Sequence, residues 1–270
     1  MGEAGALLGV WRHLVGARMR SEWQYRASFL LLLLSQSLIA AFDLAVVATL
    51  FSQVDLLAGW AGMEVALLFG LSGVSFGLAD LLISQVETSS HHIRAGTLDR
   101  FLLRPVPTLL HLSGSEFALR RIGRVAQPLA VLVVALAAAP IHWSPETVAL
   151  VPVALLSGAV IFGGIWVITS SIAFWTVESQ EVANAFTYGG GLAVQYPLDV
   201  LSAWLRRLAT FVIPLAFVAY LPAARMLGRP DPLGLPSALA WAAPAVALAV
   251  AGAARGVWSL AVRHYRSTGS

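Results

Sequence analysis

The sequence predicts an all-α polytopic membrane protein, and three observations lead to this fold class. Of its 270 residues, 58% are hydrophobic and only 11% are charged, whereas soluble domains carry about 25% charged residues. The apolar residues form runs long enough for helices to cross a hydrocarbon core of about 30 Å. These runs do not alternate between polar and apolar residues over segments of about 10, as the strands of a membrane barrel do.

The apolar runs predict six membrane spans within one transmembrane domain, residues 27–262. A shorter segment, residues 1–26, precedes them as an amphipathic helix. Its apolar residues recur at helical spacing with arginines between or after them, and they are Leu7, Val10, Trp11, Leu14 and Val15. Such a helix lies at the membrane surface. Residues 263–270 are predicted to form a tail. The predicted spans are residues 27–51, 62–84, 122–140, 147–174, 182–198 and 237–262.

Residues 203–222 are predicted to be re-entrant, between the fifth and sixth spans. The apolar part, 209–221, has about 13 residues, contains Pro214 and stops at Pro222. Runs of about 10–14 residues are more often re-entrant or interfacial than spanning. The alternative is a seventh span, which would place the basic end of the chain on the other side.

The positions of the arginines orient the chain, since basic residues favour the cytoplasmic side. With six spans, 13 of the 17 arginines are cytoplasmic, and both termini are cytoplasmic; with seven spans the count is 12. The arginine count barely separates the two topologies. The short length of 209–221 and the two prolines are stronger reasons for six spans. Residues 85–121 then form a cytoplasmic loop.

Several classes of function are excluded by what the sequence lacks. All 17 basic residues are arginine, so a P-loop is ruled out, because it needs a lysine to reach the phosphates. There is no cysteine for a thiolate metal site or a disulfide. No catalytic motif is present, and no long basic, water-soluble face could hold nucleic acid. His91 and His92 are expected to be a solvated pair rather than metal ligands.

A few polar or small residues inside the spans are candidates for a role. Asp43 lies well inside the first span, where a carboxylate costs roughly 2.5–3.5 kcal/mol; it faces a translocation pathway, or it lies near the outer headgroups and snorkels. Asp80 is expected to be structural and paired with an arginine of the following loop. Gly73 and Gly77 are four residues apart, a spacing that lets helices approach closely.

Several segments resemble the ABC-2 type transporter permeases, in particular a poorly characterised branch of bacterial export-system permeases. The likeness covers nearly the whole chain. It is carried by five segments of the sequence, namely 93–105 (IRAGTLDRFLLRP), 174–179 (FWTVES), the pair Tyr196-Pro197, 211–222 (FVIPLAFVAYLP) and 263–270 (RHYRSTGS).

The resemblance implies a permease subunit of the bacterial plasma membrane that is not itself an enzyme. It implies six spans, an N-terminal interfacial helix and a re-entrant hairpin between spans 5 and 6. The chain would pair with a second permease, as a homodimer or heterodimer, and with two ATP-binding cassette subunits that hold ATP and Mg. The chain itself needs no cofactor and contacts membrane lipids. Similar systems export drugs, lipids or glycoconjugates.

The resemblance also makes the loop between spans 2 and 3 a coupling loop, and residues 96–104 are its best candidate contact with the ATPase. Glycine permits a sharp turn before a short helix, threonine can cap that helix, and an acid in its first turn suits the helix dipole. Three apolar side chains could fill a cleft on the partner while two arginines make charge-assisted contacts. These expected interface residues are Gly96, Thr97, Leu98, Asp99, Arg100, Phe101, Leu102 and Arg104.

Two other classes of function compete with the exporter. A secondary transporter could use Asp43 to couple transport to protons, although the two halves of the chain show no convincing internal repeat. A membrane-embedded enzyme or scaffold is the third class, and the missing catalytic cluster argues against the enzyme.

Overall fold

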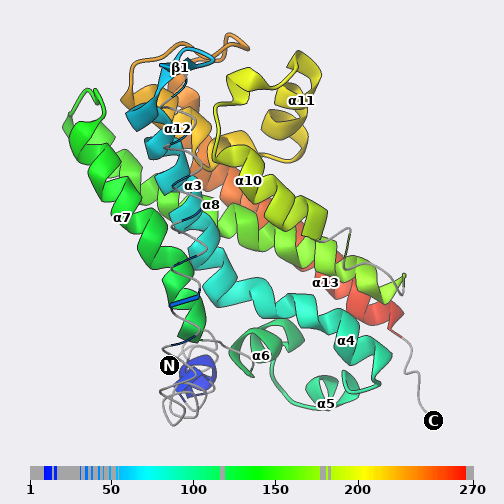
Figure 1. Ribbon diagram of the computed structural model, residues 1–270. Helices are drawn as coiled ribbons and strands as arrows, with labels where there is room; N and C mark the ends of the chain where they lie inside the picture. Colours follow the sequence, from blue (N-terminus) through cyan, green and yellow to red (C-terminus); the bar gives the residue numbers. More distant parts are fainter. Residues whose placement is uncertain are drawn as a thin grey trace.

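Helices make up nearly all of the regular structure in the computed structural model (Figure 1). The structure describes residues 55–115, 119–176, 181 and 184–265, together with scattered earlier residues (9–13, 15, 16, 31, 34, 35, 38, 42, 45, 49 and 53). The predicted first span and the predicted tail therefore lie largely outside the described residues. Of the predicted N-terminal helix, residues 9–13, 15 and 16 are described, and they are helical.

Four longer helices form the body of the part that the structure describes. α3 lies between α7 and α8, and α13 packs along α8 (Figure 1). The bounds of these helices are α3 Gly62–Ile83, α7 Gly123–Ala138, α8 Pro145–Ser171 and α13 Ala243–His264.

Four of the six predicted spans, 62–84, 122–140, 147–174 and 237–262, correspond to these helices. The predicted span 182–198 is not among the described stretches that are long and apolar enough to cross a membrane. Within the part of the chain that the structure describes, three helical stretches are long and apolar enough to cross a membrane: α3, α8 with the turn that follows it to Phe174, and α13 with the turn that precedes it from Ser237. α7 has 16 residues, and at 1.5 Å per residue it is shorter than the hydrocarbon core. α8 begins two residues before its predicted start because Ser144 and Thr147 cap each other's backbone N–H groups.

Close approach of α3 to its neighbours depends on glycine. A Cβ atom added at Gly73 would lie 2.6 Å from the Cβ of Pro128 on α7, and one added at Gly77 would lie 2.9 Å from the carbonyl oxygen of Arg124. On the facing side of α8, a Cβ at Gly158 would lie 2.6 Å from the Oγ of Ser75. The small residues predicted for helix packing thus lie where α3 touches α7.

The shorter elements gather at the two ends of the bundle. α4, α5 and α6 lie at one end, and β1, α11 and α12 lie at the opposite end (Figure 1). At the first end are η1 Ser84–Thr88, α4 Ser89–Arg94, α5 Asp99–Leu102, α6 Thr108–Ser115, η2 Leu119–Ile122 and η3 Ile172–Phe174. At or towards the other are β1 Leu56–Leu57, β2 Trp60–Ala61, η4 Ala185–Gly189, α10 Gly190–Val194, η5 Leu198–Val200, α11 Ala203–Arg207, η6 Leu208–Val212, η7 Leu215–Phe217, α12 Tyr220–Met226 and η8 Ser237–Ala242.

The segment predicted to be re-entrant is sharply bent. The helical stretches 203–212 and 215–226 meet at 77°, with Pro214 at the break. Both α11 and α12 lie at the β1 end of the molecule (Figure 1).

Polar contacts hold the β1 end together. A two-residue turn with positive φ at Ala58 and Gly59 joins β1 to antiparallel β2. The Trp60 indole and the Tyr220 hydroxyl each donate to the same Asp199 carboxylate oxygen, both at 2.8 Å. We call these contacts, with the ion pair described next, the outer clamp.

The ion pair of the outer clamp joins the start of α3 to the chain beyond α12. The Arg229 guanidinium donates to both oxygens of Glu64, at 2.6 and 3.2 Å, and lies 4.7 Å from the ring centre of Trp60. A planar guanidinium suits this combination of bidentate pairing and ring contact. The hairpin, α3 and the chain beyond α12 are therefore fixed to one another.

Candidate functional site

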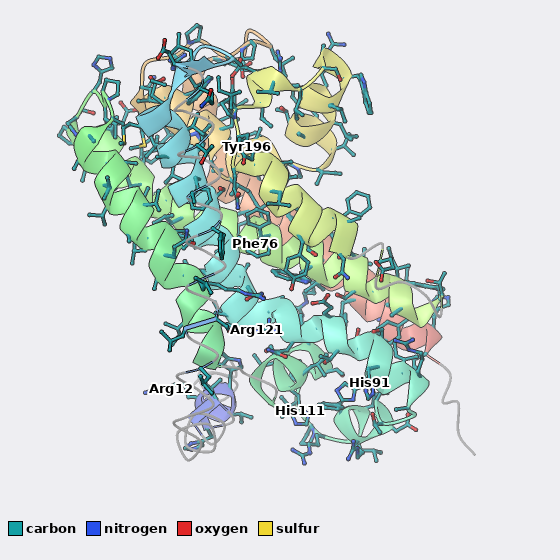
Figure 2. All side chains as sticks on the ribbon, in the orientation of Figure 1. Arg12, Phe76, His91, His111, Arg121 and Tyr196 are labelled. Carbon is teal, nitrogen blue, oxygen red and sulfur yellow. The ribbon has the colours of Figure 1, made fainter. Side chains whose placement is uncertain are left out.

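The predicted coupling segment lies at the end of the molecule opposite the outer clamp. Figure 2 shows His91 and His111 on the short helices at that end, well away from Tyr196. The chain leaves α3 through η1, forms α4, reverses, forms α5 and returns through α6. We call residues 89–115 the elbow.

A left-handed glycine makes the reversal after α4. Gly96 has a φ of 64°, which favours glycine because a Cβ atom is strained there. The carbonyl of His92 then accepts from the backbone N–H groups of Thr97 and Leu98, at 3.0 and 3.2 Å. The predicted sharp turn at Gly96 is confirmed.

Threonine does not cap α5 as expected. No side chain caps α5, and its N-cap position is Leu98. The Thr97 hydroxyl instead lies 2.9 Å from Nδ1 of His92. His92 is buried, so the prediction that it is solvated was wrong, whereas His91 is exposed.

Contacts between tilted aromatic rings fix the position of α5 between α4 and α6. The Phe101 ring lies 5.0 Å from the His92 ring and 4.8 Å from the His111 ring, measured between centroids. The Arg104 guanidinium lies 3.2 Å from Nε2 of His111, and because arginine can only donate, Nε2 accepts and His111 is neutral. Burial, together with the charge of Arg104, lowers the pKa of His111, which is consistent with the neutral ring.

The elbow divides its side chains between an inner and an outer face. Leu98 is fully buried and Phe101 is packed inward, so neither is placed to fill a cleft on a partner as the sequence suggested. Leu102 and Leu103 are the exposed apolar groups, and Leu103 is 85% exposed. With the exposed Arg100 and Arg104, they form the outer face of the elbow.

A buried carboxylate closes the base of the elbow. Asp80 near the end of α3 has a fully buried side chain; one of its oxygens lies 2.8 Å from Arg121 and the other 3.0 Å from Arg124. Arg121 also donates to the Asp80 backbone carbonyl at 3.2 Å. The predicted pairing of Asp80 with a loop arginine is confirmed. We call Asp80, Arg121 and Arg124 the lock.

A second acid lies near the lock. Burial raises the pKa of Glu87, although Arg121 acts in the opposite direction, and the nearby charge of Asp80 raises it further. Among the described residues, no group of three or more His, Asp or Glu side chains is placed to hold a metal ion.

A comparison with known protein families identifies the family of the chain. The family described as ABC-2 family transporter protein matches residues 37–269. The chain belongs to the ABC-2 family. No curated protein and no solved structure matches this ABC-2 protein significantly.

Membership in the family supports the general predictions about membrane location, transport and partner subunits. The ABC-2 protein is a multi-pass transmembrane component of a transporter, and its family is in general not enzymatic. The family works with ATP-binding cassette subunits. The interface assigned to residues 96–104 stays a prediction. Asp43, the predicted pathway residue of the ABC-2 protein, lies outside the described residues.

Three residues that shape the elbow of the ABC-2 protein were not predicted from the sequence. His92 and His111 were not expected to take part, yet they hold Phe101 between them. Leu103 was left out although it is the most exposed leucine of the elbow. Leu103 directly precedes Arg104 and Pro105 and lies beyond the end of α5. This position in the sequence could have indicated that its side chain is exposed.

Proposed function

We propose that this chain is the permease subunit of an ATP-binding cassette exporter, and that the outer face of the elbow receives the motion of a separate ATPase. The observation that carries the proposal is the outer face itself, where Leu102 and Leu103 stand exposed between Arg100 and Arg104. Exposed apolar side chains flanked by arginines are typical of a protein contact. The absence of lysine from the sequence supports an ATPase on another chain.

The architecture suggests how a push on the outer face reaches the membrane. The ring contacts of Phe101 join α5 to α4 and α6, and the lock joins the end of α3 to the start of α7. A movement of the elbow would then displace α3 and α7 as a pair instead of stretching the chain between them. Coupling of this kind requires such a contact in both states of the transporter.

The finer topology is part of the proposal. Six spans with both termini in the cytoplasm of a bacterial plasma membrane agree with the arginine count, and the 77° bend supports a re-entrant segment at 203–222. The permease would pair with a second permease, the same or different, and with two ATPase subunits that bind ATP and Mg. The cargo would be a lipid, a drug or a glycoconjugate.

The test replaces one residue of the outer face at a time in the assembled transporter. Arg100→Glu and Leu103→Ser should lower substrate-stimulated ATP hydrolysis between about five- and 150-fold, the usual range of coupling energies. Arg207→Glu, an exposed arginine on α11 at the other end, makes the same charge reversal away from the elbow and should leave the rate unchanged. Normal stimulation in both elbow variants would show that the outer face is not the contact.

The assembly itself gives a second measurement. Purification of the tagged chain from its native membrane should recover an ATPase subunit, and the recovery should fall in the Arg100→Glu variant. Transport that requires a proton gradient and proceeds without ATP would refute the exporter and favour the proton-coupled alternative.

A further inference from the structure

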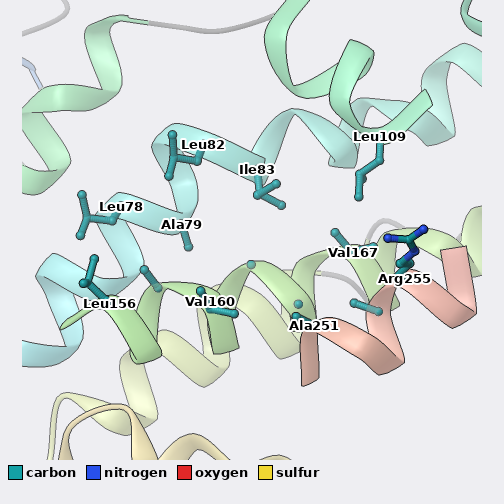
Figure 3. A pocket seen from close by; sticks show the side chains of 14 residues that line it. Leu78, Ala79, Leu82, Ile83, Leu109, Leu156, Val160, Val167, Ala251 and Arg255 are labelled. Carbon is teal, nitrogen blue, oxygen red and sulfur yellow. The ribbon is translucent and has the colours of Figure 1, made fainter. Parts of the chain in front are cut away.

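An apolar groove runs between α3, α8 and α13. Its volume is about 420 Å³, and all its lining residues are apolar except Arg255. Figure 3 shows Leu78 and Leu156 at one end of the groove and Arg255 at the other, near Val167 and Leu109. The groove therefore has an apolar body and a charged end.

Small residues keep the groove open. Gly163 on α8 and Ala251 on α13 both line it, and a Cβ atom added at Gly163 would still be 3.6 Å from the nearest atom of Ile83. Ala251 lies one turn before Arg255 on α13, so the two side chains share a helix face. Larger side chains at these positions would fill the space.

A second hollow continues the groove beyond its charged end. Its volume is about 600 Å³, and it shares Ile83, Leu109 and Arg255 with the first. It adds polar groups that the first lacks, among them Thr108 and Arg263. Both volumes fall in the range of about 300–1,000 Å³ that ligand sites occupy.

Arg255, which lines both hollows, and Arg263, which lines the second, differ from the arginines that are paired elsewhere. Arg255 and Arg263 are exposed, and no ion pair involves either of them among the residues that the structure describes. By contrast, a carboxylate lies within 3.0 Å of each of four other arginines, namely Arg121, Arg124, Arg225 and Arg229. An unpaired arginine in a membrane helix carries a free-energy cost. A bound anion would lower this cost for Arg255 at the end of the groove.

We infer that the groove binds an anionic phospholipid of the leaflet that faces the elbow. An acyl chain fills the apolar body between α3, α8 and α13, and the phosphate group lies between Arg255 and Arg263. Basic pockets between membrane helices near the cytoplasmic surface bind anionic headgroups in this way. The inference rests on the membrane location of the chain and not on the proposed export function.

The binding is measured on the full chain alone, by native mass spectrometry in detergent with phosphatidylglycerol or phosphatidylcholine of the same acyl composition. The wild-type chain should retain phosphatidylglycerol in preference to phosphatidylcholine. At about 1 kcal/mol per arginine, Arg255→Gln or Arg263→Gln should weaken phosphatidylglycerol binding about fivefold and the double variant about thirtyfold. Arg207→Gln removes an exposed arginine at the other end and should change nothing.

A second variant tests the apolar body while both charges stay in place. Ala251→Phe should reduce the retention of phosphatidylglycerol, and an unchanged thermal unfolding midpoint shows that the variant is folded. Equal binding of the two lipids, or full binding by the double arginine variant, overturns the inference. So does a monomer–dimer shift in Ala251→Phe with unaltered lipid binding, since the groove would then be an interface with a second copy. The lipid-binding experiment contains no ATPase. Its result therefore does not depend on whether the coupling proposal is correct.

Discussion

Replacement of Asp80 by asparagine should destabilise the folded protein by removing the only negative charge in the lock. Asparagine has nearly the shape of aspartate, so the packing of α3 stays as it is. Its remaining carbonyl oxygen can still accept from Arg121, but its amide group would face Arg124, which also donates. One charge-assisted hydrogen bond is lost and the other is weakened.

The size of the effect follows from the geometry of the lock. A hydrogen bond to a charged group contributes about 1.5–3 kcal/mol, and removal of one partner of a buried ion pair costs about 3–5 kcal/mol. The side chains of Arg121 and Arg124 are 18% and 35% exposed, whereas that of Asp80 is fully buried, so water compensates for part of the loss. We expect about 2–3 kcal/mol, or a fall of about 5–10 °C in the unfolding midpoint.

The assay is thermal unfolding of the purified chain, followed by tryptophan fluorescence. Asp55→Asn is the matched control because Asp55 is exposed, and it should change the midpoint little. The Arg121→Gln variant completes a double-mutant cycle: if the two groups interact, the double variant loses about 1 kcal/mol less than the sum of the single losses. A midpoint for Asp80→Asn equal to that of the control, or simple additivity in the cycle, would refute the lock.

Other consequences of the structure can be measured in the same preparation. Gly73→Ala should cost about 1–3 kcal/mol through overpacking against α7, whereas Gly252→Ala, where a Cβ meets nothing within 4 Å, should stabilise its helix by up to about 1 kcal/mol. The lowered pKa of His111 means that the unfolded chain binds this proton more readily; stability should therefore fall as the pH drops below about 6.5, and His111→Gln should reduce that fall in unfolding scans from pH 8 to 5. Arg229→Lys keeps the charge but loses the bidentate pair with Glu64, and the unfolding free energy should drop by about 1–2 kcal/mol.

The helices of the body were predictable because hydrophobic runs of this length have few alternatives in a membrane. The predicted span 62–84 became α3, Gly62–Ile83, and the predicted span 237–262 became η8 with α13. The pairing of Asp80 was foreseeable since a buried acid needs a cation. Its double partnership follows from Arg121 and Arg124 standing three residues apart on one helical face.

The orientation of the elbow could not be read from the sequence in the same way. α5 has four residues, too few for a hydrophobic period that separates an inner from an outer face. Leu98 turns inward and Leu103 outward because His92 and His111, on the neighbouring helices, hold Phe101 between them. The groove escaped prediction for a related reason, since residues from four separate helices line it.

The outer clamp sets the order in which the chain can complete its fold during synthesis. Glu64 and Arg229 are 165 residues apart, and Trp60 and Asp199 are 139 apart. Chains emerge from their N-terminal end, so α3 enters the membrane long before its partners exist. The carboxylate of Glu64 has no Arg229 to pair with until α7, α8 and α12 have been synthesised. The outer clamp therefore forms late in biogenesis. A nascent chain that stops short of Arg229 would lack the ion pair at the start of α3.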